Sequence, residues 1–208
     1  MISEQSVVFI IDDDPSVRES LESLLRSVGH TALAFASTQE FLLAERPAGP
    51  GCLVLDVRLR GQSGLEFQQE LARSGVELPI VFITGHGDIL MSVTAMKAGA
   101  IEFLTKPFRD QDFLDAVHRA VDLDRERRAA STALVDLKER FRSLTPRVRE
   151  IMMLVAAGRL NKQIAGELQL SEITVKVHRA QVMRKMQAKS LPDLDRFADK
   201  LAADTTKP

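Results

Sequence analysis

Five polar side chains stand at the ends of short apolar runs in the first half of the chain. Asp12 and Asp13 come directly after the first run, Asp56 ends the third, and Thr84 and Lys106 end or follow two later ones. Runs of this length, bounded by turn residues, are typical of strands buried on both faces. The carboxyl ends of parallel strands meet at one edge of a sheet, where open α/β folds place their ligands. We therefore expect three carboxylates, a hydroxyl and an ammonium to converge at that edge.

These groups suit phosphoryl chemistry. Neighbouring carboxylates raise one another's pKa unless a cation neutralises them. Mg²⁺ prefers oxygen ligands and usually keeps several waters, and Mn²⁺ accepts the same donors. An aspartate can act as the nucleophile in phosphoryl transfer. A phosphoryl group on Asp56 would have its oxygens neutralised by the metal, by Lys106 and by the Thr84 hydroxyl.

The polar residues at and just after the strand ends, which form what we call the acidic edge of the sheet, also have ordinary structural interpretations. Asp14 fits a helix cap, Asp56 fits a cap of the next segment, and Thr84 and Asp88 fit a turn. Lys106 fits a solvated loop. The occurrence of the whole set at strand ends of one sheet favours the chemical interpretation over these alternatives.

The elements that must position these residues alternate regularly. Strand-like and helix-like segments follow one another five times over about 120 residues, which predicts an α/β doubly wound, five-stranded parallel sheet. Asp14 with Pro15, Ser37 and Ser63 stand where helices should begin, and Gly29 stands where one should end.

Composition and charge bound the class of protein. The chain has 208 residues, 45% of them apolar and 27% charged, as in ordinary soluble proteins. Residues 1–121 carry 10 Lys and Arg against 17 Asp and Glu, and residues 145–189 carry 9 against 3. No apolar run approaches a membrane span, the amino terminus lacks a signal peptide, and the single cysteine excludes an internal disulfide. We expect a cytoplasmic, two-domain protein whose basic domain binds nucleic acid.

The acidic domain resembles a known family. Residues 6–121 look like the receiver domain of a bacterial two-component response regulator, which has a flavodoxin-like fold. The resemblance rests on Asp12-Asp13, Asp56, Thr84 and Lys106-Pro107, in this order and each at a strand end. It implies that Asp56 is the phosphoacceptor and that a sensor histidine kinase is the partner that supplies the phosphoryl group.

The same resemblance implies further roles. Thr84 and Phe103 would rearrange together on phosphorylation, although Phe103 taken alone would be an ordinary core residue. The fourth helix, fifth strand and fifth helix would form the dimerisation face. One departure is Arg60, since many receivers have proline four residues after the phosphoacceptor. The implied ligands of Mg²⁺ or Mn²⁺ are Asp12 (through water), Asp13, Asp56 and the backbone carbonyl of Arg58.

Residues 122–143 are interpreted as a helical linker. The helix that begins at Asp110 has no clear stop before 143–146, and 110–142 is expected to be mostly helical. Apolar residues recur along it at spacings of three and four, with one charged interruption, which is the pattern of a coiled-coil seam. Pairing with a second copy and a solvated, frayed linker both remain open. The seam comprises Ala120, Leu123, Arg127, Ala130, Leu134, Leu137, Phe141 and Leu144.

Residues 144–208 are predicted to be an all-helical domain. Thr145-Pro146 opens its first helix, Asn161 the second, Ser171 caps the third and Pro192 opens the last. Two short helices joined by a tight turn, the second of them basic, indicate a helix-turn-helix. A solvated basic face on a protein-binding module is the alternative. The third helix carries Ile173, Val175, Val182 and Met186, and the last three are expected to pack inward.

The outward face of the third helix is expected to enter a major groove of double-stranded DNA. Val177 and Ala180 allow close approach and suit thymine methyls, and Lys176 suits a guanine edge, with Arg184 on the same side. His178 is expected to pack or to contact phosphate rather than to bind a metal. The residues better placed for phosphate contacts are Lys162, Thr174, Arg179, Lys185 and Lys189.

The stretch 144–191 resembles the DNA-binding domain of the LuxR/NarL/FixJ family. Val148 departs from it, since the family often has glutamate there. The FixJ branch is the closest likeness, through Gly85-His86-Gly87-Asp88 and 96–100. The other matching residues are Leu144-Thr145-Pro146-Arg147, Gly158, Asn161-Lys162-Gln163-Ile164-Ala165, Thr174-Val175-Lys176-Val177-His178-Arg179 and 183–191.

Together these features indicate a DNA-binding transcriptional response regulator. Phosphorylation of Asp56 would act through dimerisation or through release of the DNA-binding domain, with RNA polymerase as a further possible partner and no membrane involved. The chain would not be an enzyme with an independent substrate. A metal-dependent phosphatase or hydrolase is the rival, but Arg58 stands where it would need a general acid and no cap insertion exists. A scaffold with a vestigial site is a second rival.

Overall fold

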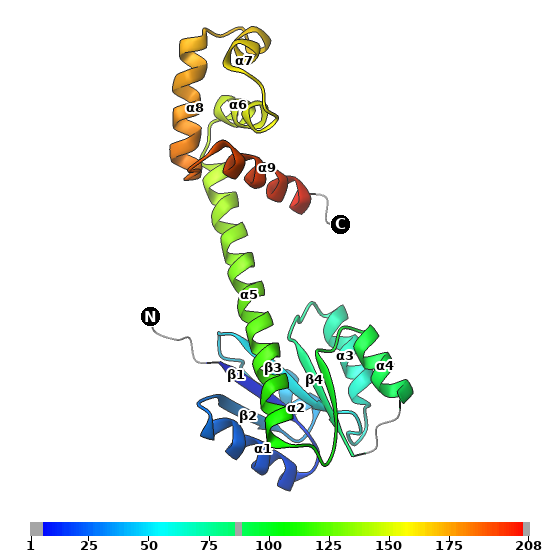
Figure 1. Cartoon of the computed structure of the whole chain (residues 1–208). Coiled ribbons are helices and arrows are strands. Elements are labelled where there is room, and N and C mark those ends of the chain that lie inside the picture. The colour runs from blue at the N-terminus through cyan, green and yellow to red at the C-terminus, as the bar shows by residue number, and fades with distance from the viewer. Residues whose placement is uncertain (1–5, 86–88, 206–208) are drawn as a thin grey trace. The chain divides into compact units, whose positions relative to one another are not determined.

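The computed structural model describes residues 6–85 and 89–205, which form two compact units. The division falls between Arg128 and Ala129, inside the segment predicted to be a linker. Figure 1 shows the elements in chain order. They are β1 (Val7–Ile11), α1 (Pro15–Ser27), β2 (Thr31–Phe35), α2 (Thr38–Leu43), β3 (Gly51–Asp56), α3 (Gly64–Arg73), β4 (Ile80–Thr84), α4 (Ile89–Lys97), β5 (Glu102–Thr105), α5 (Asp110–Arg142), α6 (Pro146–Ala156), α7 (Asn161–Leu168), α8 (Glu172–Met186) and α9 (Leu191–Thr205).

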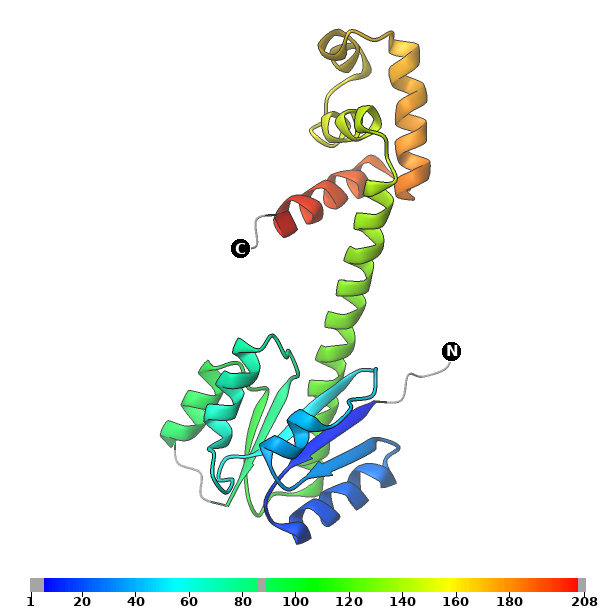
Figure 2. The same cartoon turned by 180° about the vertical axis from the view of Figure 1, so that it is seen from behind.

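The first unit is built on a five-stranded parallel sheet in the order β2-β1-β3-β4-β5. Every residue of β1, β3 and β4 is buried, because helices cover both faces of the sheet (Figures 1 and 2). Leu25 of α1 and Phe113 of α5 pack on one face, and Phe41 of α2 and Phe67 of α3 pack on the other. The predicted doubly wound sheet is confirmed.

Local sequence sets the helix starts in this unit. Asp14 accepts a hydrogen bond from the backbone N–H of Ser16, with Pro15 as the first helical residue. Ser63 and Glu66 form a reciprocal capping box at the start of α3. Both devices satisfy backbone donors that a helix leaves unpaired at its first turn. These caps fix the chain directly after β1 and shortly after β3, where the acidic side chains stand.

Helix α5 runs unbroken from Asp110 to Arg142, as predicted. Its first part packs on the sheet through Phe113 and Val117. Further along, Leu137 is buried and Phe141 half-buried in the core of the second unit. The carboxyl-terminal part of the predicted seam therefore has packing partners within its own unit, whereas Ala130 in the middle of the seam is exposed.

The second unit is a helical domain around a single apolar core. Ile151 of α6, Ile164 of α7 and Val182 of α8 are fully buried in it. Helix α7 ends at Leu168, and the left-handed backbone of the following Gln169 (φ 53°) turns the chain sharply toward α8. Val148, the departure from the family pattern, is buried in the same core and contributes an apolar contact at this position.

The described residues contain no helix that is both long enough and apolar enough to span a bilayer.

Candidate functional site

The acidic edge of the sheet is formed by the ends of four strands. β1 ends one residue before Asp12, β3 ends on Asp56, β4 ends on Thr84, and β5 ends one residue before Lys106. Because the strands are parallel and in register, with Ile11 opposite Leu55 and Asp56 opposite Ile83, these ends lie at one edge. The structure brings the predicted residues together as the alternation of elements requires.

Lys106 links the acidic residues of this edge. Its Nζ lies 2.5 Å from Asp12 Oδ2 and 3.1 Å from Asp56 Oδ1. Its backbone N–H donates to the carbonyl oxygen of Thr84 at 2.7 Å, and the Lys106–Pro107 peptide bond is cis. Since Asp12 and Asp56 are almost wholly buried, the ammonium is the cation that compensates two carboxylates removed from water.

The compensation at Asp56 is incomplete. Burial raises the pKa of the Asp56 carboxyl, and the nearby charge of Asp12 adds to this, while the charge and hydrogen bond of Lys106 act in the opposite direction. Burial alone would lower the pKa of the Lys106 ammonium, but its hydrogen bonds and charge pairs with Asp12 and Asp56 raise it instead. A further cation near the Asp56 oxygens would stabilise the charged form of this carboxyl.

Asp13 faces a different cation. Its Oδ2 accepts a hydrogen bond from Arg60 Nε at 3.0 Å, and the Arg60 side chain is 89% exposed. Arg60 is the residue that stands where many receivers have proline. Within the described residues, no group of three His, Cys, Asp or Glu side chains is already gathered to hold a metal ion. The carboxylates of Asp12, Asp13 and Asp56 are paired with Lys106 and Arg60 instead.

The remaining donors of this edge are backbone groups and a hydroxyl. Asp56 Oδ2 accepts the backbone N–H of Arg58 at 2.9 Å, which holds the start of the following loop close to the carboxylate. Thr84 is fully buried, and Phe103 is half-buried with its ring centroid 6.2 Å from that of Phe82.

Of the predicted loop motif, only Gly85 is described, and His86, Gly87 and Asp88 lie outside the described residues.

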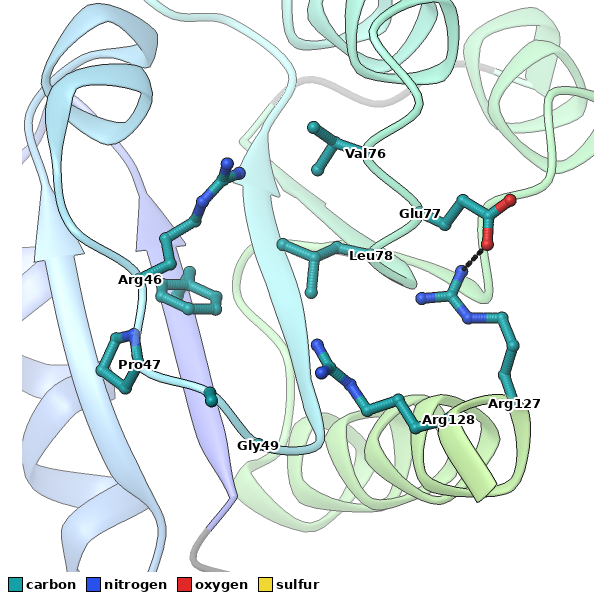
Figure 3. Close-up of a pocket in the computed structure, with 10 residues that line it drawn as sticks. Arg46, Pro47, Gly49, Val76, Glu77, Leu78, Arg127 and Arg128 are labelled. Carbon is teal, nitrogen blue, oxygen red and sulfur yellow. Dashed lines mark ion pairs between the residues drawn. The ribbon is translucent and has the colours of Figure 1, made fainter. Parts of the chain in front are cut away.

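A separate pocket of about 240 Å³ lies at the opposite edge of the sheet, before β3 and β4 begin (Figure 3). Arg46, Leu78 and Arg128 line it, and Arg127 pairs with Glu77 at 3.0 Å. It contains none of the acidic-edge residues, so its size does not make it the chemical site.

In the second unit, α8 divides into two faces as predicted. Val175, Val182 and Met186 are fully buried. Figure 1 shows that α8 is a long helix following the short α7 in the helix-turn-helix order. Ile173, for which no side was predicted, is 77% exposed, since it lies two positions, or about 200°, from Val175 around the helix. The exposed residues also include Lys176, Val177, Ala180 and Arg184.

Some residues predicted to contact phosphate have partners inside the chain. Arg179 donates to Asn161 Oδ1 at 2.6 Å and so ties α8 to the start of α7. Lys185 donates to the carbonyl of Ser143 at 2.9 Å. The Thr174 hydroxyl lies 2.8 Å from that of Ser171 at the helix cap. Lys162 and Lys189 are exposed.

The matches to known families cover both units. Residues 8–118 match the response regulator receiver domain, and residues 142–198 match the bacterial regulatory proteins of the luxR family. The chain belongs to the LuxR family of response regulators. It is a transcriptional regulator that binds DNA and is controlled by phosphorylation in a two-component system.

Individual relatives of this LuxR-family regulator agree along nearly its whole length. Nodulation protein W of Bradyrhizobium diazoefficiens is 54% identical over 199 residues, covering 96% of this chain and 88% of that protein. Transcriptional regulatory protein FixJ of Rhizobium meliloti is 41% identical, covering 92% and 94%. Among solved structures, the response regulator StyR matches with a TM-score of 0.82 at 49% identity, covering 94% of this chain and 99% of that one.

Proposed function

We propose that Asp56 is the residue that accepts the phosphoryl group from a sensor histidine kinase. The observation that carries this is the pairing of Lys106 with Asp12 and Asp56, in which the half-buried Lys106 ammonium lies 3.1 Å from one oxygen of Asp56. The other oxygen accepts a backbone N–H. A carboxylate oxygen of Asp56 attacks phosphorus on the kinase phosphohistidine, the P–N bond breaks, and an acyl phosphate forms.

The residues of the acidic edge fit a divalent cation by their chemistry, since the almost wholly buried carboxylates of Asp12 and Asp56 share one ammonium and Asp13 is paired only with the exposed Arg60. Asp13, Asp56 and the Arg58 carbonyl would hold Mg²⁺ or Mn²⁺, with Asp12 acting through water. When bound, the cation supplies positive charge to the phosphoryl oxygens. For this, Asp13 must exchange Arg60 for the metal. Lys106 would neutralise another phosphoryl oxygen, and the Thr84 hydroxyl would donate to a third.

The same proposal includes the response to phosphorylation. Thr84 and Phe103 would change position together, and the change would either pair two chains or release the DNA-binding unit. The exposed face of α8 would then enter the major groove of a two-part site, with Lys176 at a guanine edge and Arg184 beside it. Lys162, Thr174, Arg179 and Lys185 would contact phosphates, so Arg179 and Lys185 would have to share or exchange their present partners. RNA polymerase is the proposed further partner, and the cytoplasm the proposed compartment.

The experiment is a measurement of solution mass with Mg²⁺, before and after addition of beryllofluoride as an acyl-phosphate mimic. The expected result is a change from monomer to dimer in the natural chain and none in Asp56→Asn. Asp14→Asn is the matched control, because Asn also caps helices and Asp14 lies outside the pairing of Lys106 with Asp12 and Asp56. Mimic binding that survives Asp56→Asn would overturn the assignment of Asp56. Mimic binding without a change of mass would select release of the DNA-binding unit over dimerisation.

A further inference from the structure

The outward face of α8 carries an apolar stripe, formed by Ile173, Val177 and Ala180, that stays largely exposed in the described part of its unit. Ile173 is 77% and Val177 61% exposed, and Ala180 is also exposed. At 100° per residue the three positions fall within about 60° of one another. Val175, Val182 and Met186 occupy the opposite side and fill the core.

Local stability does not account for this stripe. Ile and Val are poorer helix formers than Ala, Lys or Arg, because β-branching restricts the side chain against the preceding turn. The core of the unit is already filled by the opposite face. Exposed β-branched residues at these positions therefore point to a contact made outside the chain.

Charge around the stripe identifies the kind of partner. Lys176 and Arg184 are exposed beside it on the same helix, and residues 145–189 carry 9 Lys and Arg against 3 Asp and Glu. A purely electrostatic contact with phosphates would favour Lys or Arg at the central positions too. An apolar stripe flanked by cations instead matches a major groove in which C5-methyl groups of thymine lie between phosphate backbones.

We infer that Ile173, Val177 and Ala180 read a short run of thymine methyl groups, with Ile173 as a specificity-determining residue at the leading end of α8. From Ile173 to Ala180 the helix rises about 10.5 Å at 1.5 Å per residue. This equals about three base-pair steps of 3.4 Å. The half-site contacted by one α8 thus contains thymines within a stretch of about four base pairs, on either strand. This inference rests on the proposed entry of α8 into the major groove.

In the first step of the test, the full chain is loaded with beryllofluoride and Mg²⁺. It is then used to select the DNA duplexes that it binds from a random pool. In the selected duplex each thymine is then replaced singly by deoxyuridine, which removes only the C5-methyl group. We expect two or three adjacent replacements to weaken binding by about fourfold each, the value of one buried methyl-sized group. Ile173→Ser should make one of these positions insensitive to the replacement, and Val177→Ser should do the same at a neighbouring position.

Met153→Ser is the matched control, because Met153 is an exposed apolar residue (44%) on α6. It should leave the pattern of sensitive thymines unchanged. Sequence-selective binding that tolerates every deoxyuridine, or a pattern that Ile173→Ser leaves intact, would overturn the inference while leaving DNA binding in place. The second outcome would direct attention to a protein partner for Ile173. If the chain selected no sequence at all, this result would instead contradict the proposed entry of α8 into the major groove, on which the inference rests.

Discussion

The carboxylate of Asp124 on α5 accepts the backbone N–H of Gly51, the first residue of β3, at 2.9 Å. Asp124 is completely buried and also accepts hydrogen bonds from Arg127 at 2.7 Å and Arg128 at 2.6 Å. Strand β3 ends on Asp56 at its other end. One buried carboxylate therefore fastens α5, the helix that continues into the second unit, to the base of the strand that carries the phosphoacceptor.

Removing this carboxylate should destabilise the first unit. Asp124→Ala leaves the buried N–H of Gly51 without an acceptor, a cost of about 1–3 kcal/mol. Asp124→Asn should cost less, because its amide oxygen can still accept. Urea unfolding followed by far-UV circular dichroism measures the difference. Asp122→Ala, which removes an exposed ion pair with Arg125, should change the unfolding free energy by less than about 0.5 kcal/mol. An equal loss in both variants would show that burial of Asp124 is not the cause.

Cys52 should be unreactive while the protein is folded. Burial raises the pKa of its thiol, and the charge of Asp124 raises it further. Because only the thiolate is nucleophilic, a raised pKa leaves almost none of the reactive form at neutral pH. Labelling with a disulfide reagent should be negligible in native buffer and stoichiometric in urea. In Asp124→Asn the thiol should remain protected, since burial is the larger cause. Fast labelling of the native chain would contradict the buried position of Cys52.

The fold and the acidic edge could be predicted from sequence because each rests on a local pattern. Apolar runs predict strands, caps such as Ser63 predict helix starts, and parallel strands bring their carboxyl ends together. Asp124 could not be predicted in this way. It lies in a charged stretch that looks solvated, and its partner Gly51 is 73 residues away. The pairing of Arg60 with Asp13 cannot be predicted from sequence either, since no local pattern links a loop arginine to the end of a different strand.

The α5 seam shows a second limit of sequence reasoning. Leu137 and Phe141 have the spacing of a coiled coil, but the same spacing serves any helix that packs on one side. The structure uses them in the core of the second unit. Periodicity identifies the apolar face of a helix and does not identify what covers that face.

Stability should fall as the pH is lowered through the region where histidine titrates. Burial lowers the pKa of His30, and the charges of His118 and Arg125 lower it further. Below the ordinary histidine pKa of about 6.5, His30 binds a proton more readily in the unfolded chain than in the native one. The free energy of unfolding therefore decreases as the pH falls toward the lowered pKa of native His30. His30 also lies 2.5 Å from the Ser6 hydroxyl.

The measurement is the unfolding free energy at several pH values between about 7.5 and 5.5. His30→Gln should show a smaller loss over this range than the natural chain. His118→Gln should reduce the loss only slightly, because burial is the larger cause of the shift at His30. Parallel curves for the natural chain and His30→Gln would remove His30 as a source of the pH dependence.

Arg60 should compete with the divalent cation for Asp13. Its guanidinium lies 3.0 Å from Asp13 Oδ2, and its side chain is 89% exposed, so the pair contributes at most about 1 kcal/mol. On the proposed assignment of Asp13 as a metal ligand, Arg60→Gln should therefore tighten Mg²⁺ binding about two- to fivefold at low salt. Calorimetric titration of the unphosphorylated chain measures this without any phosphoryl transfer. The gain should shrink at about 1 M salt, where charges are screened beyond about 3 Å.

A general loss of positive charge near the site would also favour Mg²⁺, so the comparison needs a matched variant. Arg58→Gln removes an exposed arginine at the same edge and keeps the backbone carbonyl. It should tighten Mg²⁺ binding less than Arg60→Gln, and Arg60→Lys should stay close to the natural chain because the cation remains. If Arg58→Gln and Arg60→Gln gave equal gains, the effect would be one of overall charge and the Arg60–Asp13 contact would have no special part in metal binding.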